Sequence, residues 1–249
     1  MKHYLVAAIS ALALTACSPQ TGDTSMPDTK APISYAAEGW TVKSLPELAE
    51  ALQTGEVSAE ALTQAYLDRI ELVDRSGPTL QAVLTLNPDA LEAARALDAK
   101  RDAGEPLGAL HGLPILLKDN IETADNMPTT AGALALKDNV TGRDSPLVAG
   151  LRAEGAIILG KTNLSEWANI RDSSSTSGWS AVGGLVRNPY AIARNSCGSS
   201  SGSGAAVAAG FAWAAIGTET NGSITCPASG NGVVGFKPTV GLVSRTYVV

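Results

Sequence analysis

Histidine is scarce in this chain, with two copies in 249 residues. The sequence has no HExxH motif, no closely spaced histidine pair and no CxxC motif, which leaves little material for a metal site. No lysine stands three residues after a Ser or Thr, which excludes the S-x-x-K nucleophile of β-lactamase-like enzymes. The glycine-rich stretch at 198–204 contains no lysine and is therefore no Walker A motif. We expect neither a metal nor another cofactor.

Positive charge is also limited. Eighteen Lys and Arg face 24 Asp and Glu, the net charge is −6, and no basic run occurs. Nucleic-acid binding needs clustered Lys and Arg to contact phosphates, so this class of partner is excluded. Hydrophobic residues make up 45% of the chain and charged residues 17%, which predicts a sizeable core in one large domain or two small ones.

The N-terminus predicts export. Lys2 precedes an apolar run, 4–14, that is too short to span a bilayer, which needs ~20 residues. The run ends in Leu-Thr-Ala-Cys17, which resembles the lipobox of bacterial lipoproteins. This resemblance implies a signal peptide over 1–16, a lipidated Cys17 and an envelope location, with Ser18 favouring the outer membrane. An ordinary secretory signal that is cut nearby is the alternative. Residues 17–38, rich in Ser, Thr, Pro and Asp, are typical of a flexible tether.

Two further cysteines, Cys197 and Cys226, flank two serine-containing loops. Export permits a disulfide, and a bridge can form if the loops meet. Sequence gives no Cα separation, and half-buried cysteines behave as small hydrophobes. We therefore expect two free thiols.

Helical and strand patterns alternate from Trp40 onward, which predicts an α/β layered fold with a mostly buried sheet. Asn87 is the expected N-cap of the third helix, with Pro88 in its first turn. The pattern predicts helices at 44–55, 59–72, 87–104, 145–155, from 163 or 165, and at 205–210. It predicts strands at 80–86, 113–117 and 156–159, and leaves 211–216 as either type. The chain stops inside a β-branched run, 245–249, so we expect a domain interrupted at its C-terminus.

A serine hydrolase of the G-x-S-x-G type is one alternative. Residues 198–202 match this motif and would make Ser200 the nucleophile. That motif needs a strand before it, whereas 187–196 is polar and contains proline. It also needs a later histidine, and none follows His111.

A serine with a lysine base is the other alternative. Lys118 directly follows the apolar run 113–117, so burial can lower its pKa from ~10.4 towards the ~7–8 that a base requires. Taken singly, each feature has a simpler explanation. A lysine at a strand end can be solvated, Ser203 can cap the following helix, and Asn221-Gly222 can form a turn.

Taken together, these segments strongly resemble the amidase signature family. The resemblance runs from about Trp40 to Val249 and rests on 112–120, 198–210, 217–235, 160–166, 187–190 and 234–239. Ser223 also follows Ser199 by 24 residues, which is the family's spacing between its two catalytic serines. The implied fold is a central mixed β-sheet flanked by helices, with 39–249 as the N-terminal part of the domain.

The resemblance also implies a Ser-Ser-Lys triad. Ser223 is then the nucleophile, and Ser199, in a cis peptide, relays the proton to the base Lys118. Backbone N–H groups would form the oxyanion hole. These are expected from Thr220, Asn221, Gly222 and Ser223, with Ser200 supporting the site and Ser173 to Ser175 near the acyl pocket.

The segments 178–183, 224–227 and 239–245 look most like bacterial peptide amidases, although those usually have Asp at position 221. Asn221 keeps the backbone donor and removes a charge, so we expect an altered rate or preference. Family domains are roughly twice as long as this chain without its signal peptide. We expect an exported amidase that hydrolyses linear carboxamides, with C-terminal peptide amides as the leading substrate. The alternatives are a transamidating subunit of a tRNA-dependent amidotransferase and an inactive, truncated lipoprotein.

Overall fold

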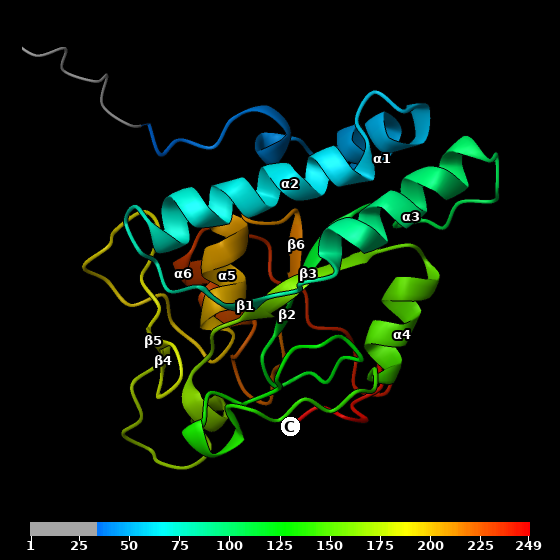
Figure 1. Ribbon diagram of the computed structural model, residues 1–249. Helices are drawn as coiled ribbons and strands as arrows, with labels where there is room; N and C mark the ends of the chain where they lie inside the picture. Colours follow the sequence, from blue (N-terminus) through cyan, green and yellow to red (C-terminus); the bar gives the residue numbers. More distant parts are fainter. Residues whose placement is uncertain (1–33) are drawn as a thin grey trace, which may run out of the picture. The chain divides into compact units, whose positions relative to one another are not determined.

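A central four-stranded sheet organises the part of the chain that the structure describes, residues 34–249 (Figure 1). In this computed structural model, the strands stand in the order β1–β3–β2–β6. They are β1 (Val83–Leu86), β2 (Pro114–Lys118), β3 (Ile157–Thr162) and β6 (Ala214–Ile216). Strand β2 runs parallel to both of its neighbours, and β1 runs antiparallel to β3. The predicted α/β fold with a mixed sheet is confirmed. The predicted signal peptide, including the lipobox, lies outside the described residues.

Residues 35–249 form one compact unit, in which six helices and a small second sheet surround the central sheet. The helices are α1 (Leu45–Thr54), α2 (Ala59–Ile70), α3 (Ala90–Asp102), α4 (Pro146–Ala153), α5 (Ser201–Ala208) and α6 (Thr225–Gly230). Helices α2 and α3 lie side by side (Figure 1). The second sheet pairs β4 (Trp179–Ser180) with β5 (Gly184–Leu185). None of the helices within residues 34–249 is long and apolar enough to cross a membrane.

Short helical turns complete the fold, at Gly39–Val42, Glu71–Arg75, Leu134–Leu136 and Glu166–Asn169. The second of these is a π-helical turn that directly continues α2. The first helix begins with the predicted capping box at Ser44 and ends at Gly55, whose φ of 76° is left-handed. Helix α4 begins at the expected cap, because Ser145 Oγ accepts from Val148 N–H at 3.3 Å. Local sequence therefore decides these boundaries.

The predicted start of α3 is wrong. The helix begins at Ala90, and Asn87 is not its N-cap. The Asn87 side chain instead donates to the Ile158 carbonyl at 2.8 Å and to the Asp125 carboxylate, and its oxygen accepts from Asp89 N–H. Its amide therefore joins strand β1 to strand β3, so the helix begins three residues later.

Helix α5 is the glycine-rich segment of the sequence, and its residues 201–206 are all buried. A Cβ on Gly202 would lie 2.3 Å from the Ala82 carbonyl oxygen, so only glycine allows the helix to approach the sheet this closely. Ser203 lies inside the helix, which contradicts the alternative that it is a cap. Its hydroxyl contacts Thr162 Oγ1 at 2.8 Å and donates to the Ile216 carbonyl at 3.1 Å. The ambiguous segment at 211–216 ends in strand β6.

Candidate active site

Lys118 ends strand β2, which lies between β3 and β6 in the centre of the sheet. Its side chain is fully buried. Burial disfavours the ammonium form and lowers the pKa of Lys118 to about 7. A substantial fraction of this lysine is therefore a neutral amine near neutral pH, as a general base must be.

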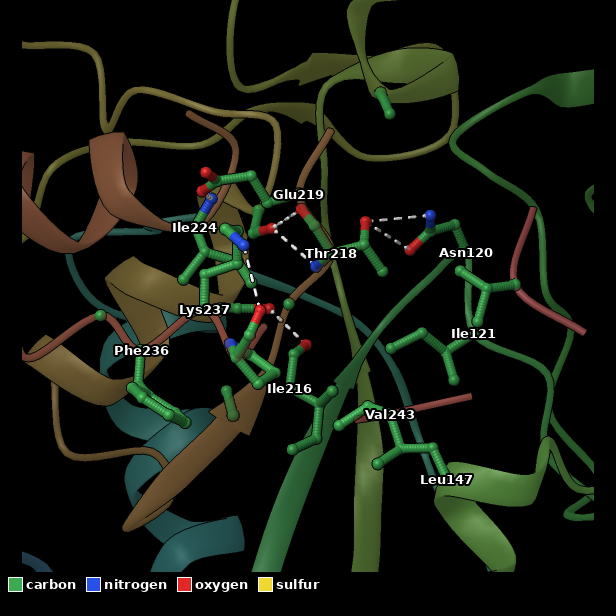
Figure 2. Close-up of a pocket in the computed structure, with 18 of the residues that line it drawn as sticks. Asn120, Ile121, Leu147, Ile216, Thr218, Glu219, Ile224, Phe236, Lys237 and Val243 are labelled. Atoms are coloured by element: carbon green, nitrogen blue, oxygen red, sulfur yellow. Dashed lines mark hydrogen bonds between the residues drawn. The ribbon is translucent and has the colours of Figure 1, made fainter. Parts of the chain in front are cut away.

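The amine of Lys118 contacts two hydroxyl groups. Nζ lies 2.7 Å from Ser199 Oγ and 2.8 Å from Thr218 Oγ1, and it also donates to the Thr218 carbonyl at 3.3 Å. Ser199 is buried, and the Gly198–Ser199 peptide bond is cis, as expected. Asn120 Nδ2 donates to Thr218 Oγ1 at 3.2 Å and thereby fixes that hydroxyl (Figure 2). Lysine and one serine are thus in direct contact, as the sequence predicts.

Sequence reasoning did not identify Thr218. Its position is recognisable in retrospect, since it follows strand β6 by two residues and β6 pairs with β2, which ends in Lys118. Residues that leave neighbouring parallel strands at the same edge lie close together. That relation requires knowledge of the pairing of β6, which its short length conceals.

Ser200 has a supporting position. Its hydroxyl is buried, donates to the Thr218 carbonyl at 3.1 Å and accepts from Thr218 N–H at 3.2 Å. No strand leads into it, because the nearest pairing before it is an isolated bridge between Arg187 and Asn195. The G-x-S-x-G match is therefore no nucleophile elbow. Ser200 joins the start of α5 to the chain that follows β6.

Ser223 lies in a turn between β6 and α6 and is half-buried. Its carbonyl accepts from Ser200 N–H at 3.1 Å, so the two serine loops meet through their backbones. Within residues 34–249, the Ser223 hydroxyl forms no hydrogen bond with another group of the chain. The structure therefore brings Ser223 beside the loop of Ser199 and leaves its hydroxyl unengaged.

Glu219 organises the Ser223 turn. Its Oε2 accepts from Ile224 N–H at 2.7 Å and from Thr225 N–H at 2.9 Å. Figure 2 shows the side chain of Glu219 beside Ile224. Burial raises the pKa of Glu219, whereas hydrogen bonds from the backbone N–H groups of Thr225, Ile224 and Gly222 lower it. The combined effect of these hydrogen bonds is larger, so the pKa of Glu219 lies below its usual value. The carboxylate is therefore ionised at neutral pH and caps the start of α6. Sequence reasoning did not assign it a role.

The expected oxyanion donors lie in the same turn. Within the described part of the chain, the N–H groups of Thr220, Asn221 and Ser223 donate no hydrogen bond to another residue. Thr220 and Asn221 are exposed, and Gly222 has a left-handed φ of 77°. These backbone donors are available to an oxygen of a bound molecule.

A cavity of about 1080 Å³ opens beside the turn. Figure 2 shows Asn120, Thr218 and Glu219 contributing its polar groups, while Ile121, Ile216 and Phe236 contribute apolar ones. Such a mixture of an apolar wall with a few polar groups is typical of a small-molecule site. Ser173 to Ser175 lie in an exposed turn and are not among the residues that line this cavity.

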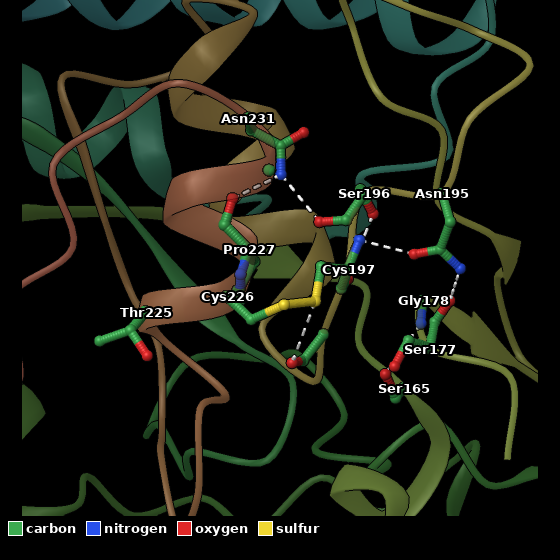
Figure 3. The surroundings of a disulfide bond; sticks show 12 residues. Ser165, Ser177, Gly178, Asn195, Ser196, Cys197, Thr225, Cys226, Pro227 and Asn231 are labelled. Carbon is green, nitrogen blue, oxygen red and sulfur yellow. Dashed lines mark hydrogen bonds between the residues drawn. A yellow bond between two sulfur atoms is a disulfide. The ribbon is translucent and has the colours of Figure 1, made fainter. Parts of the chain in front are cut away.

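The expectation of two free thiols is wrong. Cys197 and Cys226 form a disulfide, with their Cα atoms 5.9 Å apart (Figure 3). Two hydrogen bonds explain why the loops meet: Ser200 N–H donates to the Ser223 carbonyl, and the Asn231 side chain donates through Nδ2 to the Ser196 carbonyl at 2.9 Å. The spacing in sequence did not reveal either contact.

A second buried lysine lies next to the first. Lys161, on β3, is fully buried, and its Nζ donates to the Ile121 carbonyl at 2.6 Å and to Thr129 Oγ1 at 2.8 Å. The Asp119 carboxylate lies 3.7 Å away. Burial lowers the pKa of Lys161 and raises that of Asp119, and their mutual attraction opposes both shifts. The pair fixes the backbone directly after Lys118. No group of His, Cys, Asp or Glu within residues 34–249 is arranged to hold a metal ion.

Comparison with known proteins places this geometry in a family. The family model described as amidase matches residues 61–249. A probable amidase of Arabidopsis thaliana is 46% identical over 208 residues, which are 83% of this chain and 40% of that protein. The A subunit of the glutamyl-tRNA(Gln) amidotransferase of Acidothermus cellulolyticus is 48% identical over 204 residues, or 82% of this chain and 39% of that protein. The chain thus spans about 40% of the length of the curated relatives it matches.

Solved structures agree with this assignment. The native peptide amidase of Stenotrophomonas maltophilia superposes with a TM-score of 0.82 and 56% sequence identity. The match covers 84% of this chain and 42% of that one. The central mixed sheet, its helices and the two serine loops are therefore part of a known fold, and this chain belongs to the amidase family.

Proposed function

We propose that this protein hydrolyses a linear carboxamide to a carboxylic acid and ammonia through an acyl-enzyme on Ser223. The contact between the buried amine of Lys118 and Ser199 Oγ, at 2.7 Å, carries the proposal. A lysine whose pKa is lowered to about 7 can accept a proton at neutral pH, and Ser199 directly precedes Ser200, whose N–H donates to the Ser223 carbonyl. Membership of the amidase family supports the same reaction.

The chemistry proceeds in two halves. Ser223 Oγ forms a bond to the amide carbonyl carbon, its proton passes to Ser199, and the Ser199 proton passes to Lys118 Nζ. The C–N bond then breaks, and Lys118 returns the proton through Ser199 to the departing nitrogen, which leaves as ammonia. Water cleaves the acyl ester by the same relay, releases the acid and restores the Ser223 hydroxyl.

The oxyanion of each tetrahedral intermediate binds in the Ser223 turn. The N–H groups of Thr220, Asn221 and Ser223 have no other partner within the described residues, and Gly222 contributes a backbone without a side chain. Donors of this kind stabilise a transition state by ~3–4 kcal/mol each. Glu219 holds the turn in shape from its other side.

C-terminal peptide amides are the proposed substrates. The similarity to a solved peptide amidase, 56% over most of this chain, supports this choice. The adjacent cavity supports it as well, because its apolar wall, which includes Ile121 and Ile216, suits the side chain of a peptide's last residue. The neutral Asn221 would alter the preference between substrates rather than the triad.

A fluorophosphonate probe tests the nucleophile. We expect mass spectrometry to find one adduct on Ser223 and none on Ser200, and release of ammonia from a short peptide amide. Lys118→Ala should lose the adduct while keeping the native circular dichroism spectrum. Lys100→Ala, an exposed lysine on α3, is the matched control and should label normally. Absence of the adduct in folded protein contradicts the proposal and favours the alternative of an inactive lipoprotein.

Transfer of ammonia to a tRNA-bound substrate is a second candidate function. It is supported by the 48% identity to the A subunit of a glutamyl-tRNA(Gln) amidotransferase. Glutaminase activity distinguishes the two candidates. Release of ammonia from free glutamine only in the presence of partner subunits favours the second candidate, and release from a peptide amide by the chain alone favours the first.

We also propose that Cys17 carries a lipid and anchors the protein in the outer membrane of a bacterial envelope, facing the periplasm. This proposal rests on the sequence 14–17 and on Ser18 directly after it. Mass spectrometry of the N-terminal peptide from exported protein should show a diacylglyceryl modification on Cys17. An unmodified peptide that begins elsewhere contradicts it and indicates an ordinary secretory signal.

A further inference from the structure

The Cys197–Cys226 disulfide joins the two loops that carry the proposed catalytic serines (Figure 3). Cys197 precedes Ser199 by two residues, and Cys226 follows Ser223 by three. Cys226 is exposed and Cys197 is half-buried, so a small dithiol in solution can reach the bond. The bond therefore lies at the site, and it is accessible.

Few hydrogen bonds hold the turn 220–223 in place. Within the described residues, one hydrogen bond connects this turn to the chain outside 219–226, from Ser200 N–H to the Ser223 carbonyl. The bonds of Glu219 are local, because its carboxylate accepts from Ile224 and Thr225. The disulfide is thus the second direct link between residues 219–226 and the loop of Ser199, and the bond from Asn231 Nδ2 to the Ser196 carbonyl lies farther along the chain, after α6.

Ser199 is held independently of the disulfide. Its hydroxyl contacts Lys118 Nζ, and its carbonyl accepts from Ser165 N–H at 3.0 Å. Ser223 has one of these two kinds of contact, because its carbonyl accepts from Ser200 N–H, whereas its hydroxyl has no partner within the described residues. Loss of the disulfide should therefore loosen the Ser223 turn and leave the pair of Lys118 and Ser199 in contact.

We propose that Cys197 and Cys226 are positioning residues whose disulfide holds Ser223 in line with Ser199, so that reduction slows acylation of Ser223. The inference rests on the proposed function. Reduction consumes one dithiol: its two thiols become a disulfide, the bond between Cys197 and Cys226 breaks, and each cysteine receives a proton and becomes a thiol. Reoxidation reverses the change.

The test measures the rate at which a fluorophosphonate labels Ser223 in the 249-residue protein. We expect labelling to slow at least tenfold after treatment with dithiothreitol and to recover after reoxidation. The Cys197→Ser/Cys226→Ser variant should label at the slow rate and show no response to dithiothreitol, which excludes an effect through Cys17. Equal rates in the oxidised, reduced and variant proteins would overturn the inference.

Amide hydrogen exchange gives a readout that does not depend on labelling. Reduction should speed exchange in a peptide that covers 219–226 and leave a peptide that covers 114–120 unchanged. Unchanged exchange in 219–226 overturns the inference. Faster exchange together with an absent Ser223 adduct in the oxidised protein supports the link between the loops and contradicts the proposed amidase function, so the two failures are distinguishable.

Discussion

Lys118 Nζ and Ser199 Oγ lie 2.7 Å apart in the interior, although 81 positions separate the two residues in the chain. The lysine comes from the end of a central strand, and the serine comes from the loop that leads into α5. Both side chains are fully buried. The fold thus holds a titratable amine against a hydroxyl where water does not compete for either group.

The pH dependence of acylation should follow the titration of Lys118. Burial lowers the pKa of this lysine to about 7, and only its neutral form accepts a proton. The rate of Ser223 labelling should therefore rise with pH through about 7 and reach a plateau above it. Stopped labelling reactions, followed by mass spectrometry across this range, measure the profile. A rate that is independent of pH between about 6 and 8 contradicts the role of Lys118 as base.

The same shift has a consequence for stability. Between about 7 and the ordinary value of 10.5, the unfolded chain binds more protons at Lys118 than the folded protein does. The contribution of Lys118 to the free energy of unfolding should therefore rise with pH over this window. Urea unfolding of the wild type and of Lys118→Met at several pH values isolates the contribution of Lys118 to the free energy of unfolding. The difference between the two proteins should change with pH, and a constant difference would contradict the lowered pKa.

Thr218 should influence the pKa of Lys118. Its hydroxyl is one of two that contact Lys118 Nζ, and as an acceptor it stabilises the ammonium form. Thr218→Val should shift the rising limb of the pH profile to lower pH. It should also reduce the plateau rate roughly tenfold, which corresponds to the ~1.4 kcal/mol expected for one hydrogen bond. Thr54→Val, at an exposed threonine of α1, is the control. A profile that moves to higher pH would show that Thr218 acts in another way.

Removal of Glu219 should loosen the turn that carries Ser223. Glu219→Ala leaves the N–H groups of Ile224 and Thr225 without their acceptor, whereas Glu219→Gln keeps one oxygen. We expect the rate of Ser223 labelling to fall about tenfold in the first variant and less in the second. Because the pKa of Glu219 is lowered, its contribution to stability is present above its usual pKa and is lost as the pH falls through the lowered value.

Glu50→Ala, at an exposed position of α1, serves as the control for Glu219→Ala. Thermal unfolding of both variants at neutral pH and in acid measures the contribution of Glu219 to stability. Equal labelling rates for Glu219→Ala and Glu50→Ala would show that the turn keeps its shape without the carboxylate.

Lys161 and Asp119 should be energetically coupled. Lys161→Met leaves the buried carboxylate of Asp119 without its cation, so we expect a loss of ~3–5 kcal/mol in the free energy of unfolding. Lys161→Met combined with Asp119→Asn should recover part of that loss, because the second change removes the unpaired charge. Urea denaturation of both variants measures the loss in the free energy of unfolding and its partial recovery. Additive losses in the double variant would contradict the coupling.

Much of the helical layer could be predicted from sequence, because local patterns decide it. Ser44, Gly55 and Ser145 mark the ends of α1 and the start of α4 as expected. The prediction failed where a side chain has a distant partner. Asn87 carries a sequence typical of an N-cap, but its amide bonds to β3, and no local pattern reveals that contact.

In the candidate site as well, some residues could be predicted from local sequence and others could not. Lys118 and Ser199 could be predicted because a lysine after an apolar run and a serine in a glycine-rich segment belong to a recognisable signature. Thr218 and the disulfide could not, since both depend on how β6 and the loop after it pack against the sheet. The fold thus adds the groups that tune and align the residues that sequence already indicates.

Helix α5 also constrains how this sequence can vary. Six of its eight residues are buried, and they include two glycines and two serines as well as alanines. In a deep mutational scan, positions 201–206 should form a continuous block that tolerates almost no substitution, whether or not a position takes part in chemistry. The tolerance of these positions to substitution will therefore report how α5 packs. Sensitivity to substitution alone does not show a catalytic role for a neighbour such as Ser199, so that role has to be measured with a change of one atom, as in Ser199→Cys.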